Sequence, residues 1–257
     1  MLRHRLVLVA SALFVVGACG GAASDTTTTE AGLEGELLVS AAASLTDAFA
    51  EVESAFEAAN PGVDVVLNLG SSSSLREQIL EGAPADVFAS ANTSNMDQVA
   101  EAGEVEGEAE IFVLNELQIA VPAGNPAGVA GLDDFASEAL LIGLCAEEVP
   151  CGSFGREALE KAGVTPAVDT NEPDVRALLT KVEAGELDAG IVYVTDVLST
   201  AGAVEGVVIP DEFNVIADYP IAALVNAPNP DAAAAFVEFV LSEEGQAILV
   251  EFGFSSP

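Results

Sequence analysis

Two short stretches of small and hydroxyl-bearing residues suggest binding chemistry in this 257-residue chain. They are "SAAASLTDAF" at 40–49 and "GSSSSLREQI" at 70–79, and in each the serines stand where a helix is expected to begin. Helix N-termini bind anions through unpaired N–H groups and the helix dipole, and serine hydroxyls add further donors. The two stretches therefore predict an anion site. The alternative for Ser44, in "SLTD", is a plain helix cap.

The first 18 residues have the pattern of a secretory signal. "MLRHR" is basic, residues 6–16 are almost all apolar, and two small residues precede Cys19. The apolar run is too short to span a bilayer. Its end resembles a lipobox, which predicts cleavage before Cys19 and lipidation of that cysteine; a plain signal peptide is the alternative. Residues 19–35 are small and polar, which predicts a flexible tether. We expect an exported protein, anchored by lipid to the outer face of the cell membrane.

Removal of the signal leaves a chain that lacks the residues for several functions. His4 is the only histidine, so the mature chain has no Ser-His-Asp or Cys-His nucleophile and no histidine zinc site. Five lysines and arginines remain against 42 acidic residues. They are too few to neutralise phosphates, so we expect no nucleic-acid partner. The acidic residues predict a solvated surface, and the 51% of hydrophobic residues predict a substantial core.

Strand-like and helix-like segments alternate along the rest of the chain. Strands are expected at 35–41, 63–69, 86–90, 117–123, 140–144, 189–194 and 222–227. Helices are expected at about 45–59, 73–81, from 95, and at 154–162, 174–184, 195–200, 230–241 and 243–251. This alternation predicts an α/β fold of parallel sheets with helices on their faces. Ligands of such folds bind beyond the carboxyl ends of the strands, where both serine stretches lie.

Five motifs in order resemble one protein family. They are "AAASLTDAF", "GSSSSLREQI" with "GAPADVFASA" close behind, "VPCG" (149–152), "DVRALL" (174–179) and "GIVYVTDV" (190–197). From about Glu36 to the C-terminal "FGF", the chain is similar to the molybdate-binding proteins of bacterial ABC importers, the ModA family. The resemblance implies a solute-binding protein and no enzyme. It would capture molybdate or tungstate, deliver the oxyanion to an ABC transporter permease, use no cofactor and act as a monomer.

The resemblance also implies a fold and a set of ligand contacts. The fold is the type II periplasmic-binding-protein fold, with a ligand cleft between two α/β lobes: lobe 1 at 36–115 plus 217–257, and lobe 2 at 116–216. The hydroxyl of Tyr193 would bind the ligand, as would hydroxyls and amides of Ser44 and Ser72, with Ser71 and Ser73 as neighbouring alternatives to Ser72. Backbone amides of Cys151 and Val175 would complete the site.

Every group in this implied set is a hydrogen-bond donor. Donors alone suit an anion that is fully deprotonated at neutral pH, such as molybdate, tungstate or sulfate. Phosphate keeps protons that would lack an acceptor, at a cost of about 1 to 3 kcal/mol. The metal would enter as an oxyanion, without direct ligands to a metal cation.

Cys145 and Cys151, in "CAEEVPC", are six positions apart. Export to an oxidising compartment predicts a disulfide between them. Such a bridge would fix the loop that carries the Cys151 amide and so preorganise one oxyanion donor. Two buried free thiols are the alternative.

Two other functions remain open at this point. One is a binding protein for another anion, sulfate or an organic carboxylate; Arg176 pointing into the cleft would favour a carboxylate, which arginine binds in a fork. The other is a carboxylate-dependent hydrolase, for which Asp47 and Asp86 would be the pair. Such a pair would stand about 5 to 10 Å apart in the cleft.

Overall fold

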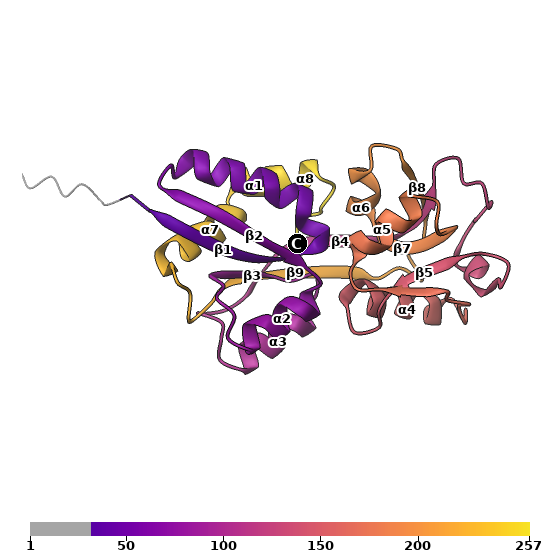
Figure 1. The fold of residues 1–257 in the computed structure, drawn as a ribbon, viewed down its shortest axis with the longest axis horizontal. Coiled ribbons are helices and arrows are strands. Elements are labelled where there is room, and N and C mark those ends of the chain that lie inside the picture. Colours follow the sequence, from indigo (N-terminus) through magenta and orange to yellow (C-terminus); the bar gives the residue numbers. More distant parts are fainter. Residues whose placement is uncertain (1–31) are drawn as a thin grey trace, which may run out of the picture. The chain divides into compact units, whose positions relative to one another are not determined.

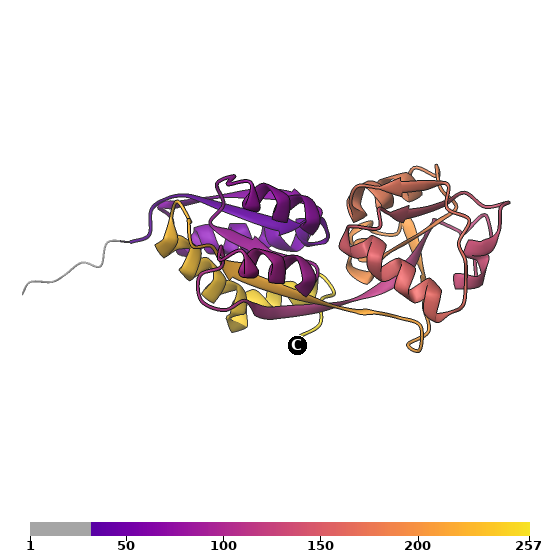
Figure 2. The same cartoon turned by 90° about the horizontal axis from the view of Figure 1, so that it is seen from below.

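The computed structural model describes residues 32–257, which form a mixed α/β fold (Figures 1 and 2). The predicted signal at 1–18, the predicted lipidation site Cys19 and most of the predicted tether lie outside the described residues. None of the helices in residues 32–257 is both long and apolar enough to span a bilayer.

The strands of the described chain form one nine-stranded sheet, in the order β2-β1-β3-β9-β4-β7-β5-β6 with β8 paired to β4. The strands are β1 (Gly35–Ala42), β2 (Val63–Gly70), β3 (Val87–Ala89), β4 (Glu110–Pro122), β5 (Ile142–Cys145), β6 (Thr170–Glu172), β7 (Ala189–Tyr193), β8 (Val204–Val208) and β9 (Ile216–Ala223).

Eight α-helices and two short 3-10 helices connect these strands over residues 32–257. They are η1 (Ala43–Leu45), α1 (Thr46–Ala59), α2 (Ser72–Leu80), α3 (Thr93–Glu101), η2 (Leu132–Ala136), α4 (Pro150–Lys161), α5 (Val175–Glu183), α6 (Val194–Ser199), α7 (Pro230–Leu241) and α8 (Glu243–Glu251).

The sheet divides into two lobes that β4 and β9 connect (Figure 1). The first lobe is built on β1, β2 and β3, which are parallel, and the second on β5, β6 and β7, which are also parallel. β4 pairs with β9 over its first half and with β7 and β8 over its second half, always antiparallel. The expected parallel strands are thus present in both lobes, and the antiparallel pairs that β4 and β9 add make the whole sheet mixed. β9 follows β8 without an intervening helix, and β4 and β9 run between the lobes in opposite directions.

Helices cover both faces of the first lobe, with α1, α7 and α8 on one side and α2 and α3 on the other (Figure 1). Phe49, Val52 and Phe56 of α1 are spaced by three and four residues, which places them on one face of the helix, and all three are completely or almost completely buried. Phe56 packs edge-on against Phe236 of α7, with ring centroids 5.2 Å apart. A separate cluster on the opposite face contains Leu75, Ile79, Met96, Val99 and Phe88.

Two paired glycines let α5 approach the sheet of the second lobe closely. Gly143 of β5 lies opposite Gly190 of β7. A Cβ atom at either position would stand 2.7 or 2.9 Å from Cδ1 of Leu178 in α5, nearer than such atoms pack. The two glycines therefore fix the depth at which α5 lies on the sheet, and with it the position of the helix N-terminus.

Candidate functional site

A small cavity lies between the two lobes, where β1, β2 and β7 end. Its volume of about 20 Å³ suits only a compact ligand. The five residues predicted to bind the ligand all line it. The complete lining is Ala42, Ala43, Ser44, Gly70, Ser71, Ser72, Ala91, Val149, Pro150, Cys151, Asp174, Val175 and Tyr193.

Ser44 lies in η1, the 3-10 turn that leads from β1 into α1. Helix α1 begins only at Thr46, with Leu45 in the capping position, so a capping role for Ser44 is wrong. The Oγ atom of Ser44 instead lies 2.8 Å from the hydroxyl oxygen of Tyr219 in β9. Asn115 Nδ2, which can only donate, lies 3.5 Å from the same Tyr219 oxygen. The Tyr219 hydroxyl can therefore accept a hydrogen bond from Asn115 and donate one to Oγ of Ser44. In that arrangement the hydroxyl hydrogen of Ser44 is free to donate into the cavity.

The serines at the start of α2 have distinct roles. Ser71 caps the helix, with its Oγ accepting from the Ser74 amide at 3.3 Å. Ser72 is the first helical residue, and its Oγ accepts from the Ala91 amide at 2.9 Å. The Ser72 hydroxyl hydrogen is thereby left to donate elsewhere. Ser73 does not line the cavity, whereas Ser71 does.

Cys151 and Val175 bring backbone amides from the second lobe. Cys151 is the second residue of α4, which starts at Pro150, four residues earlier than expected, because proline suits the first helical position. Val175 is the first residue of α5. N–H groups in a first turn have no partner within their helix. Both amides are thus available to a ligand in the cavity.

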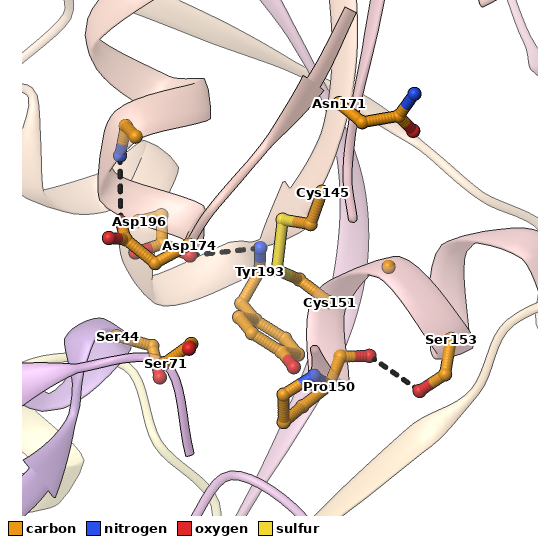
Figure 3. The surroundings of a disulfide bond; sticks show 12 residues. Ser44, Ser71, Cys145, Pro150, Cys151, Ser153, Asn171, Asp174, Tyr193 and Asp196 are labelled. Carbon is orange, nitrogen blue, oxygen red and sulfur yellow. Dashed lines mark hydrogen bonds between the residues drawn. A yellow bond between two sulfur atoms is a disulfide. The ribbon is translucent and has the colours of Figure 1, made fainter. Parts of the chain in front are cut away.

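A disulfide joins Cys145, at the end of β5, to Cys151, with their Cα atoms 5.7 Å apart (Figure 3). The loop between them folds tightly onto α4, where a Cβ atom at Gly152 would stand 1.8 Å from the carbonyl oxygen of Ala146. The guanidinium of Arg156 donates to the carbonyl oxygens of Cys145 at 2.8 Å and Gly152 at 3.0 Å. The loop that carries the Cys151 amide is thus fixed by a covalent bond and by hydrogen bonds.

Tyr193 is the last residue of β7, and its ring projects toward Pro150 at the cavity (Figure 3). Its side chain is buried, yet its hydroxyl has no hydrogen-bond partner among residues 32–257. Burial raises the pKa of the Tyr193 phenol well above its usual value, and the nearby Tyr219 and Asp196 add to the rise. The hydroxyl therefore stays protonated and can donate to a ligand.

Asp196 is a buried carboxyl that the sequence reasoning missed, although it stands in the motif "GIVYVTDV". One of its oxygens, Oδ2, accepts from the Tyr193 amide at 3.1 Å, and the other lies 3.5 Å from Nε of Arg176. Burial raises the pKa of Asp196 to about 7, although the Arg176 guanidinium and the Tyr193 amide oppose the rise. Asp196 thereby holds the backbone that carries the Tyr193 ring.

Asp174 is a second carboxyl that the sequence reasoning missed. It lines the cavity, but its carboxylate caps α5 by accepting from the Ala177 amide at 2.9 Å. The cap satisfies one N–H group of the α5 first turn and leaves the Val175 amide free for a ligand.

The residues that would support the two alternative functions lie elsewhere. Arg176 does not line the cavity; it forms an ion pair with Asp47. Asp86 stands before β3, at the opposite end of the strand from the cavity, and accepts from the amides of Leu38 at 2.7 Å and Asn229 at 2.5 Å. The cavity therefore contains neither an arginine fork nor the proposed carboxylate pair. Within residues 32–257 no group of three or more His, Cys, Asp or Glu side chains could hold a metal ion.

Comparisons with known proteins agree with the motif resemblance. Residues 37–255 match the family model described as bacterial extracellular solute-binding protein. The molybdate-binding protein ModA of Mycobacterium tuberculosis is 40% identical over 221 residues, which cover 86% of this chain and 85% of the relative. The family consists of solute-binding proteins and not of enzymes, which confirms that part of the prediction.

Two solved structures share the fold at low sequence identity. The periplasmic molybdate-binding protein of Azotobacter vinelandii has a TM-score of 0.76 and 18% identity, covering 86% of this chain and 99% of that one. The sulfate-binding protein SubI of Mycobacterium tuberculosis has a TM-score of 0.78 and 19% identity, covering 86% of each chain. The predicted periplasmic-binding-protein fold is therefore confirmed. With the family model matched over residues 37–255 and 40% identity to a ModA protein over 86% of its length, the chain belongs to the ModA family of bacterial extracellular solute-binding proteins.

Proposed function

We propose that this protein captures molybdate or tungstate outside the cytoplasm and delivers it to an ABC importer. The observation that carries the proposal is the buried hydroxyl of Tyr193, which lacks a partner within residues 32–257, while Tyr193 lines the small cavity between the lobes. A buried donor without an acceptor costs about 1 to 3 kcal/mol. A ligand oxygen in the cavity would remove that cost.

The other groups proposed to contact the anion are also hydrogen-bond donors. They are the hydroxyls of Ser44 and Ser72, which also bond to the Tyr219 hydroxyl and the Ala91 amide, and the first-turn amides of Cys151 and Val175. The relatives named as molybdate-binding proteins support this choice of anion. Phosphate, which is partly protonated at neutral pH, would bring a hydrogen into a ring of donors, and this mismatch disfavours it.

Sulfate is the second candidate, because it is also a fully deprotonated tetrahedral anion and would satisfy the same donors. The shared fold with a sulfate-binding protein is compatible with this alternative. An organic carboxylate is less well supported, since the guanidinium of Arg176 is occupied by Asp47.

The anion would bind as the two lobes close. Ser44 and Ser72 belong to the first lobe, while Cys151, Val175 and Tyr193 belong to the second. We propose the boundaries 36–115 plus 217–257 for the first lobe and 116–216 for the second, with movement in the segments that connect them. The protein would act as a monomer that presents its closed form to the permease.

Lipidation of Cys19 would keep the protein at the outer face of the membrane. A membrane-fraction assay checks this part of the proposal. Cys19→Ser should move the protein from the membrane and detergent phases into the soluble fraction or leave the precursor unprocessed. Fully soluble behaviour of both forms would contradict the anchor.

The oxyanion assignment is tested by thermal unfolding of the ligand-stripped protein with a panel of anions at equal ionic strength. A ligand at a thousandfold excess over its Kd stabilises the native state by about 4 kcal/mol. That corresponds to a rise in Tm of roughly 10 °C for a protein of this size. Molybdate and tungstate should produce this rise, sulfate a smaller one and phosphate none. A flat response to molybdate and tungstate would show that the assignment is wrong.

A further inference from the structure

Arg176 connects the two lobes without lining the oxyanion cavity. It is the second residue of α5, in the second lobe. Its guanidinium forms an ion pair with Asp47 of α1, and its Nε donates to the carbonyl oxygen of Ala43 at 3.3 Å. Both partners belong to the first lobe and flank Ser44. The contact therefore bridges the lobes beside the residues proposed to bind the anion.

Residues of the second lobe also contact the Arg176 side chain. Nη1 of Arg176 donates to Oγ of Ser199 at 3.0 Å, and Nε lies 3.5 Å from Oδ1 of the buried Asp196. These contacts stay within the second lobe and survive if the lobes move apart. The contacts to Asp47 and Ala43 cannot survive, because Ser44 and Val175 must separate for an anion to enter the cavity.

The ion pair is partly open to solvent. The side chains of Arg176 and Asp47 are 26% and 44% exposed. Both line a second cavity of about 460 Å³ on the far side of Ser44. Water can reach the pair as the lobes part, so breaking it does not leave either charge buried. Partial exposure also limits the strength of the pair to that of a moderately screened interaction.

We propose that Arg176 is a positioning residue whose ion pair with Asp47 latches the closed form and slows release of the bound anion. Neither side chain touches the anion. The latch forms only when the lobes close, so it acts on the dissociation rate more than on the association rate. This inference rests on the proposed function for its kinetic readout.

A purely structural role for Arg176 predicts a different result. In that case its contacts to Ser199 and Asp196 would anchor α6 to α5, and Asp47 would be an ordinary surface carboxylate. Changes at Asp47 would then leave the dissociation rate unaltered. Asp47 is thus the residue to change, since loss of Arg176 would also leave the buried Asp196 without its cation.

The decisive variant is Asp47→Asn, compared with Asp231→Asn. Both aspartates are the second residue of a helix, α1 and α7, so the two changes have matched effects on helix dipole and net charge. Asp231 is exposed and makes no ion pair among residues 32–257. Asp47→Glu keeps the carboxylate and serves as the rescue.

Stopped-flow tyrosine fluorescence can follow the binding and release of molybdate, because the chain has two tyrosines and no tryptophan. Tyr193 lines the cavity, and Tyr219 is hydrogen-bonded to Ser44. Asp47→Asn should raise the dissociation rate about 2- to 5-fold, with a smaller change in the association rate. Asp231→Asn should match the wild type, and Asp47→Glu should restore most of the slow release. An unchanged dissociation rate in Asp47→Asn, or an equal change in Asp231→Asn, would overturn the latch.

A ligand-free measurement separates failure of the latch from failure of the proposed function. If the wild type binds none of molybdate, tungstate or sulfate, the proposed function is wrong. The latch is then judged by small-angle X-ray scattering of the ligand-free full-length chain. Asp47→Asn should have a larger radius of gyration than Asp231→Asn, because fewer molecules are closed. Equal radii would overturn the latch.

Discussion

Replacement of Tyr193 by phenylalanine should change ligand affinity and intrinsic stability in opposite directions. The substitution removes only a buried hydroxyl that lacks a hydrogen-bond partner within residues 32–257. Without ligand, that hydroxyl is a liability of about 1 to 3 kcal/mol, part of which a water in the cavity would relieve. Tyr193→Phe should therefore unfold with a free energy equal to the wild type or up to about 1 kcal/mol higher.

With ligand, the same hydroxyl becomes a donor to an anion. A hydrogen bond to a charged group contributes about 1.5 to 3 kcal/mol. That range corresponds to a roughly 10- to 150-fold weaker Kd for the variant. Titration calorimetry with molybdate gives the affinity, and urea denaturation of ligand-stripped protein gives the free energy of unfolding.

Tyr219→Phe is the matched control, since these are the only two tyrosines in the chain. The Tyr219 hydroxyl bonds to Ser44 at 2.8 Å, so its removal should destabilise the ligand-free protein by about 1 kcal/mol. If Tyr193→Phe also destabilises the ligand-free protein and binds molybdate as tightly as the wild type, its hydroxyl is not an unpaired donor awaiting an anion, and the reasoning fails.

Three further predictions concern the surroundings of this hydroxyl. Ser44→Ala and Ser72→Ala should each weaken molybdate binding by about 1.5 to 3 kcal/mol in calorimetry; unchanged affinity in both would contradict the donor set. Reduction of the Cys145–Cys151 disulfide should weaken binding because the Cys151 amide loses its preorganised loop, and thiol alkylation before and after reduction reports the redox state. The pKa of Asp196 is raised in the folded state to about 7, so its contribution to stability is present at low pH and declines as pH rises from about 4 to 7. The stability of Asp196→Asn relative to the wild type should therefore increase over that range, by up to about 4 kcal/mol, and a flat difference would refute the shift.

Local patterns in the sequence predict the helices and the residues around the cavity well. The apolar residues of α1 recur within a few positions and predict that helix, and all five predicted contact residues line one cavity. The start of α4 was missed by four residues, although Pro150 marks it. Two strands were missed because their sequences lack an apolar run: β6 reads TNE, and a Glu-Gly pair interrupts the valines of β8, VEGVV. The strand expected at 222–227 is observed as β9, Ile216–Ala223, because β9 pairs with β4 along the path between the lobes.

Contacts between polar side chains that are far apart in the sequence could not be predicted from it. Ser44 meets Tyr219 across 175 positions, and Arg176 meets Asp47 across 129. A local pattern shows that a serine stands near a helix start, but not which distant side chain will accept or donate. For the same reason a helix cap was a reasonable alternative for Ser44, although the 3-10 turn before α1 makes it wrong.

The bond between Ser44 and Tyr219 also bears on how the protein folds after export. Within residues 32–257 it joins η1, the turn that follows the first strand, to β9, the last strand, and contacts between such distant positions form late and slowly because a long loop must close first. The cavity is therefore incomplete until β9 has docked beside β4. An oxyanion that needs the complete cavity cannot speed folding, but it can slow unfolding of the finished protein. Scarcity of the anion would then shorten the lifetime of the native state without delaying its formation.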